Sequence, residues 1–176
     1  MDLRDFYATT AQACFTVLSV WWVILGLNFQ RWVKDSHRRL AVYDVSLYFL
    51  LPGLMSLVSL LAVGVPEIWR VAFALGATVG AVESVLLPIR RGRRSGTAGL
   101  ERGADWLSFV LFVLIGVVAV RPSLVGSAGI GLRPLELTGL LIAALLVIGL
   151  LLAWLMFVTT AAEQAKEEEP ATADAA

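Results

Sequence analysis

The chain has 176 residues, of which 59% are hydrophobic and 16% are charged. Soluble domains usually carry about 25% charged residues, so this composition is typical of a membrane protein. The 14 basic and 14 acidic residues cancel to a formal net charge of zero, and we therefore expect no nucleic-acid partner.

Five long apolar stretches divide the chain. They cover residues 6–30, 45–66, 71–89, 106–120 and 137–162, and Glu83 is the only charged residue within them. About 20 apolar residues in a helix cross the hydrocarbon core of a bilayer, although the fourth stretch is shorter. Residues 140–152 are apolar on all sides, unlike a helix of a water-soluble bundle. The sequence predicts an all-α integral membrane protein with five transmembrane helices, at about 7–28, 45–65, 68–89, 105–121 and 136–160.

The segments between these helices are too short to bury a core of their own. We therefore expect a single five-helix transmembrane domain over residues 1–162. Residues 163–176 are rich in Ala, Glu and Pro, which predicts a disordered acidic tail. Asp105 is placed to cap the fourth helix, and the uniformly apolar fifth helix is expected at the lipid-facing periphery.

The distribution of basic residues predicts the orientation, because cationic loops stay in the cytoplasm during insertion. One side would hold Arg31, Lys34, Arg38, Arg39, Arg90, Arg91, Arg93, Arg94, Arg102 and Lys166, and the other Arg4, Arg70, Arg121 and Arg133. The N-terminus is thus expected outside and the C-terminus in the cytoplasm. Arginine outnumbers lysine twelve to two, which is typical of a GC-rich genome and favours a bacterial plasma (inner) membrane.

The lipid bilayer itself is the first expected partner. Anionic lipid headgroups attract juxtamembrane basic residues, and the expected contacts are Arg38, Arg39, Arg90, Arg91, Arg93 and Arg94.

The first expected helix carries a polar face. Gln12, Thr16 and Ser19 follow Thr9 at spacings of three or four residues, which places them along one side. These groups either bond to neighbouring helices and to their own backbone, or line a wetted pathway. Both interpretations turn this face away from lipid.

The second helix contains Pro52 and Gly53 in its interior. Proline removes a backbone hydrogen bond and weakens a helix locally, so we expect a kink. The kink serves either gating or helix packing, and packing is favoured because membrane helices tolerate proline.

The third helix carries small residues at every fourth position, a pattern that lets another helix approach closely. This small-residue ridge consists of Ala72, Gly76, Gly80 and Ser84. Glu83 borders it, and an ionisable group inside a membrane span is costly, by about 2.5 kcal/mol or more at the centre. Glu83 therefore has either a structural role or a role in permeation.

No motif of known chemistry is present. The chain has one histidine (His37) and one cysteine (Cys14), and no metalloprotease or nucleophile-elbow signature, so we expect neither an enzyme nor a metal or cofactor site. Two functions remain open. The first is a homo-oligomeric ion channel or solute pore, self-associating through the ridge and lined by Glu83, Gln12, Thr16 and Ser19. The second is a non-conducting scaffold or an accessory or regulatory subunit that binds a partner membrane protein.

Overall fold

A computed structural model describes residues 2–29, 36–62, 65–91, 98–127, 129 and 131–173 of the chain. These residues form six helices and no strand. The helices are α1 (Leu3–Leu27), α3 (Ser36–Leu61), α4 (Pro66–Arg91), α5 (Ala98–Val120), the short α6 (Ser123–Ser127) and α7 (Pro134–Ala173).

Five of these helices are long and apolar enough to cross a membrane, which confirms the predicted number. Their apolar spans are Leu3–Leu27, Arg38–Leu61, Glu67–Ile89, Arg102–Val120 and Pro134–Thr160. The protein is thus a multi-pass, all-α membrane protein. Helices α3 and α5 begin earlier than predicted, at Ser36 rather than 45 and at Ala98 rather than 105.

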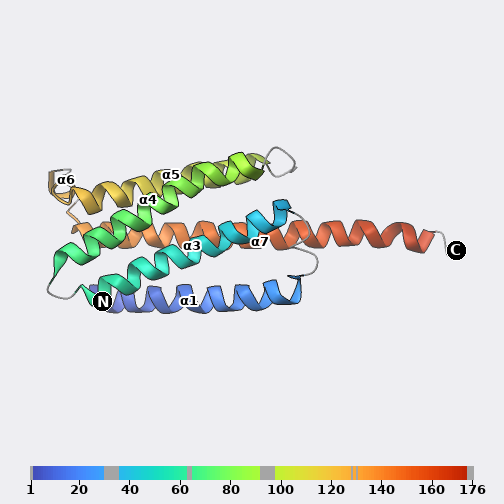
Figure 1. Cartoon of the computed structure of the whole chain (residues 1–176), viewed down its shortest axis with the longest axis horizontal. Coiled ribbons are helices and arrows are strands. Elements are labelled where there is room, and N and C mark those ends of the chain that lie inside the picture. Colours follow the sequence, from blue (N-terminus) through green and yellow to red (C-terminus); the bar gives the residue numbers. More distant parts are fainter. Residues whose placement is uncertain are drawn as a thin grey trace.

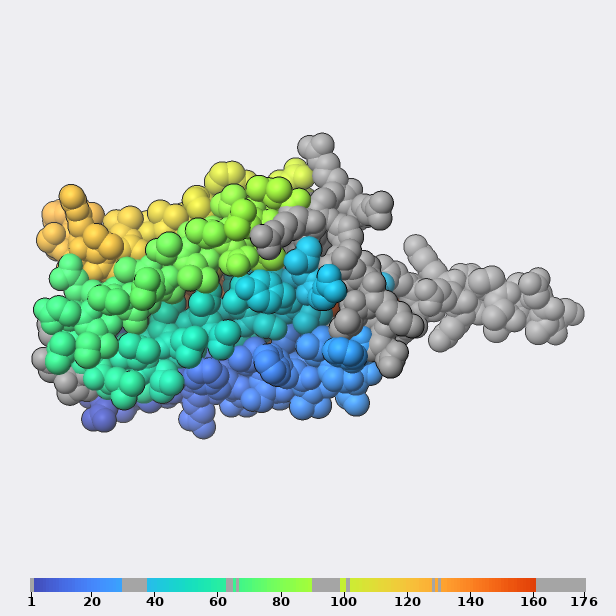
Figure 2. Space-filling view, viewed as in Figure 1, coloured from blue at the N-terminus to red at the C-terminus, as the bar shows by residue number. Residues whose placement is uncertain are grey.

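The helices form an antiparallel bundle (Figure 1). Helices α1 and α3 pack side by side, as do α4 and α5, and α3 also contacts α4. Helix α7 packs against α1, α3 and α5, and it lies behind α3 and α4 in the space-filling view (Figure 2). Thr138, Ile142 and Leu145 of α7 are fully buried, whereas Leu140, Leu151 and Trp154 are exposed. Helix α7 thus has one buried side and one outward side, and its expected lipid-facing position stays a prediction.

Two buried clusters hold the bundle together. The larger includes Tyr7, Phe73, Ile115 and Leu145, which come from α1, α4, α5 and α7. The smaller lies around Trp21, between α1 and α3, with residues of α7 packed against it. Each span thus contributes to a shared core, which fixes the side chains of the candidate site.

Helix α7 continues to Ala173, whereas the sequence predicts that it ends near 160 and that a disordered tail begins at 163. Its last turns extend beyond the other helices (Figure 1). Ala, Glu and Lys are strong helix formers, so a helix already nucleated in the bundle can continue through them. The N-terminus and the end of α7 lie at opposite ends of the bundle, as an odd number of spans requires.

Candidate functional site

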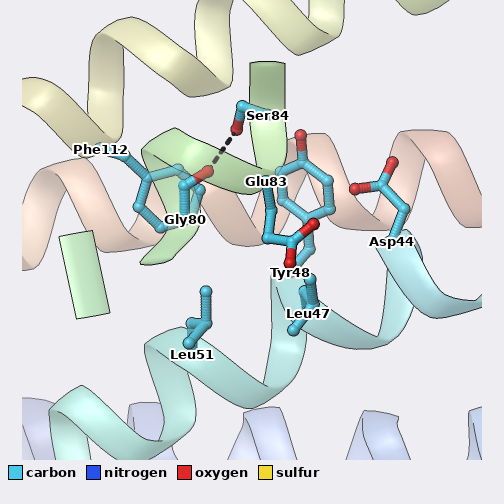
Figure 3. Close-up of a pocket in the computed structure, with 8 residues that line it drawn as sticks. All are labelled: Asp44, Leu47, Tyr48, Leu51, Gly80, Glu83, Ser84 and Phe112. Carbon is cyan, nitrogen blue, oxygen red and sulfur yellow. Dashed lines mark hydrogen bonds between the residues drawn. The ribbon is translucent and has the colours of Figure 1, made fainter. Parts of the chain in front are cut away.

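Glu83 lines a small cavity between three helices. Figure 3 shows Glu83 and Asp44 lining it from the neighbouring helices α4 and α3. The full lining comprises Asp44, Leu47, Tyr48 and Leu51 of α3, Gly80, Glu83 and Ser84 of α4, and Phe112 of α5. The site is therefore built within one chain.

The carboxylate of Glu83 has few partners. The Tyr43 hydroxyl donates to its Oε1 over a long distance of 3.5 Å. Its Oε2 is buried and has no hydrogen-bond partner in the part of the chain that the structure describes. The Ser84 hydroxyl, which also lines the cavity, donates instead to the Gly80 carbonyl at 2.7 Å. A polar atom that is buried without a partner usually costs about 1–3 kcal/mol.

The cavity is too small for a permeation pathway. Its volume is about 10 Å³, near the minimum of about 10–15 Å³ that holds one water molecule. One water could supply the bond that Oε2 lacks. Within the described residues, the geometry thus fits a locally hydrated carboxylate rather than an open conduit.

Two aspartates that the sequence places at or before helix starts are buried inside helices. Asp44 was expected just before the second helix, which was predicted to begin at 45, but it lies inside α3 and is 5% exposed. Asp105 was predicted to cap a helix, but α5 begins at Ala98, so Asp105 lies in its interior and is 8% exposed. The sequence does carry a signal for the earlier start of α3. Leu40 and Val42 before Asp44 and Val45 after it are apolar, which indicates that the helix begins before the uncharged stretch.

The polar residues of α1 are not part of this site. Gln12, Thr16 and Ser19 are exposed on the outer face of α1, and no α1 residue lines the cavity. The Ser19 hydroxyl donates to the Phe15 carbonyl at 2.7 Å, so it is satisfied within its own helix. Gln12 and Thr16 form no hydrogen bond with any described residue. Of the predicted pathway residues, Glu83 therefore lies inside the bundle, whereas Gln12, Thr16 and Ser19 lie on its outer surface.

The small-residue ridge is occupied inside the chain. A Cβ atom on Gly76 would lie 2.7 Å from Met55 Sδ of α3, and a Cβ on Gly80 would clash directly with the Phe112 ring of α5. Ala72 packs against the larger cluster. The prediction that copies of the protein associate through this ridge is corrected by these contacts, because its central glycines are covered by α3 and α5.

Pro52 and Gly53 lie where α3 meets α1. Both are buried, and a Cβ on Gly53 would lie 3.0 Å from Cys14 Cβ and 3.4 Å from Phe15 Cζ. Helix α3 continues through Pro52 to Leu61. This placement is consistent with the packing interpretation, and the predicted gating role stays untested.

Four of the predicted headgroup residues lie in helix turns near one end of the bundle. Arg38 is partly buried and Arg39 is exposed, both in the first turns of α3. Arg90 and Arg91 lie in the last turn of α4, but their side chains are outside the described part, as are residues 93 and 94 entirely. Headgroup binding at these arginines therefore stays a prediction.

No group of three or more potential metal-ligating side chains occurs among the described residues. Comparison of the chain with protein-family models, with curated proteins and with solved structures finds no match.

Proposed function

We propose that the protein is an accessory subunit of a membrane assembly, and that it binds a transmembrane helix of a partner protein through the outward face of α1. In this proposal it resides in a bacterial plasma membrane and conducts nothing by itself. The observation that carries it is the exposed Gln12, a polar side chain deep within a membrane span.

The depth of Gln12 makes its exposure costly. It lies nine residues after the start of α1 at Leu3, which is about 14 Å along the helix axis at 1.5 Å per residue. There the exposed carboxamide would face hydrocarbon, where a polar group without a hydrogen bond costs several kcal/mol. A neighbouring helix that offers a donor or acceptor would remove this cost.

The surroundings of Gln12 suit close helix packing. Ala8, Thr9, Ala13 and Thr16 are exposed on the same side of α1. Farther along the helix, a Cβ placed on Gly26 would meet nothing within 4 Å. Small side chains allow two backbones to approach, and hydroxyl groups bond across the contact. We name this surface, made of Ala8, Thr9, Gln12, Ala13 and Thr16, the α1 face.

The α1 face also supports a second candidate function. If several copies turned this face toward a common axis, Gln12, Thr16 and Ser19 would form rings of polar side chains around a pore. The spacing of four and three residues between these side chains favours such a pore. It would keep three of the four pathway residues predicted from the sequence and leave out Glu83.

Photocrosslinking in the native membrane tests the proposal. A photoreactive amino acid replaces Gln12, and the control replaces Leu151, which is 62% exposed on α7. We expect an adduct with a different membrane protein from position 12 only, and we expect Thr16→Leu to weaken it. An adduct of twice the subunit mass would point to self-association instead. Equal labelling from both positions, or none from position 12, would contradict the proposal.

Conductance separates the two candidates. The purified protein in liposomes should pass no ions if it is an accessory subunit. Ion flux that disappears in Gln12→Leu but persists in Glu83→Gln would establish the channel lined by the α1 face and overturn the accessory role.

A further inference from the structure

A second hollow lies on the outer surface of the bundle, between α4 and α5, away from the Glu83 cavity. It has a volume of about 380 Å³, which falls within the usual range of about 300–1,000 Å³ for ligand pockets. Its lining includes Ala74, Thr78, Val113, Gly116, Val117 and Arg121. We call it the α4–α5 groove.

The groove is apolar along its length. Ala74 and Gly116 are too small to fill the space between the helices, and Val113 and Val117 are exposed beside it. The Thr78 hydroxyl donates to the Ala74 carbonyl at 2.7 Å, so it does not need a polar ligand. Its contents in a membrane must therefore be mostly hydrocarbon.

One end of the groove is positively charged. Arg121 follows the last residue of the α5 span and is exposed, and it forms no ion pair with any carboxylate in the described ranges. Arg70 lies one turn before Ala74 on α4. Its Nε and Nη2 donate to the Ala119 and Val120 carbonyls at 3.0 and 2.9 Å, which fixes a second guanidinium at the end of α5. A guanidinium has five N–H donors, so Arg70 has further donors to offer.

The dimensions match a lipid lying along the bundle. From Arg121 to Val113 the groove follows eight residues of α5, or about 12 Å into the apolar span. A phosphodiester at the two arginines would lie at the membrane surface, and an acyl chain would extend inward from it. Arginine binds phosphate oxygens through paired hydrogen bonds. This end of the groove would therefore favour an anionic headgroup over one without net charge.

We infer that the α4–α5 groove binds one acyl chain of an anionic phospholipid, with the lipid phosphate at Arg121 and Arg70. This site lies at the end of the bundle opposite Arg38 and Arg39, and it is independent of the α1 face.

A photoactivatable phosphatidylglycerol with a diazirine in its acyl chain tests this inference on the full-length protein in nanodiscs. We expect labelled peptides from α4 and α5, and competition by unlabelled phosphatidylglycerol but not by phosphatidylcholine. Arg121→Gln should reduce this labelling about tenfold, since one charged hydrogen-bonded contact is lost. Arg133→Gln, at the same end but outside the groove, should leave it unchanged.

Filling the groove provides a second variant pair that does not depend on charge. Val117→Trp should block labelling of α4 and α5. Leu114→Trp, at a similarly exposed position of α5 that does not line the groove, should not. Equal labelling in Arg121→Gln and wild type, or equal competition by phosphatidylcholine, would overturn the inference. Labelling spread evenly over all five spans would overturn it as well.

Discussion

Gly80 shows how a single residue determines the packing of α4 on α5. The Phe112 ring occupies the space that any Cβ on Gly80 would need. Phe112 is 3% exposed and belongs to the larger buried cluster, so it has little room to move. The absence of one side chain at position 80 thus permits a large aromatic ring to fill the interface.

Gly80→Ala should therefore destabilise the protein although alanine favours helices. Inserting a methyl group into a packed interior typically costs about 1–3 kcal/mol. Gly26→Ala is the matched control, because its Cβ would meet nothing within 4 Å and alanine should improve helix propensity. Thermal unfolding in mild detergent should give a lower midpoint for Gly80→Ala only. A midpoint equal to wild type would mean that Phe112 has space to shift.

At the residue scale, the sequence identified the kind of contact but not its partner. The four-residue spacing of Gly76 and Gly80 correctly indicated a close helix approach. The same spacing serves a contact within the chain or between chains, and only the structure shows Met55 and Phe112 filling it. Glu83 was recognised as unusual because charge in a span is costly, yet Asp44 was missed because the predicted helix begins at the uncharged stretch that follows it.

At the scale of helices, the apolar stretches predicted the number of spans and missed some of their ends. Hydrophobicity reports which residues lie in hydrocarbon, whereas a helix continues for as long as its backbone hydrogen bonds are favourable. Helix α3 therefore includes Asp44, and α5 includes Asp105. Which side of α7 is buried was also hidden, because a helix that is apolar on every side gives no sign of it.

A buried hydroxyl contributes to the contact between α7 and the start of α1. Tyr7 is 3% exposed, and its hydroxyl donates to the Leu135 carbonyl at 2.7 Å and lies 3.1 Å from Thr138 Oγ1. The single Thr138 hydroxyl proton is shared between the Pro134 and Leu135 carbonyls, each 3.0 Å from Oγ1. This network joins the first and last spans, which are distant in sequence.

Tyr7→Phe should weaken this connection by about 0.5–1.5 kcal/mol, the usual net worth of a hydrogen bond. The ring remains, so its packing against Phe73 is preserved and only the hydroxyl is tested. Phe6→Leu removes the neighbouring, partly buried ring while keeping the Tyr7 hydroxyl. Hydrogen exchange in detergent should be faster near residues 134–138 in Tyr7→Phe than in Phe6→Leu. Exchange near residues 134–138 that is no faster in Tyr7→Phe than in the wild-type protein would show that the hydroxyl network contributes nothing specific.

For the whole molecule, the fold groups the basic residues as a fixed orientation requires. Helix α3 begins with Arg38 and Arg39, and α4 ends with Arg90 and Arg91, at the end of the bundle where α7 emerges (Figure 1). The end that holds the N-terminus carries fewer basic residues, among them Arg70 and Arg121. This asymmetry across the bundle is the physical basis of the orientation that we predict from the sequence.

Reporter fusions in a bacterial host measure that orientation. Alkaline phosphatase, which is active only outside the cytoplasm, should be active when fused after Val65 and inactive when fused after Ala173. Green fluorescent protein exported in an unfolded state does not fluoresce, so it should give the opposite pattern at the same two positions. Replacing Arg90, Arg91, Arg93 and Arg94 with glutamine removes much of the asymmetry and should yield mixed topologies. An active phosphatase after Ala173 in the wild-type chain would place the basic end outside and reverse the proposed orientation.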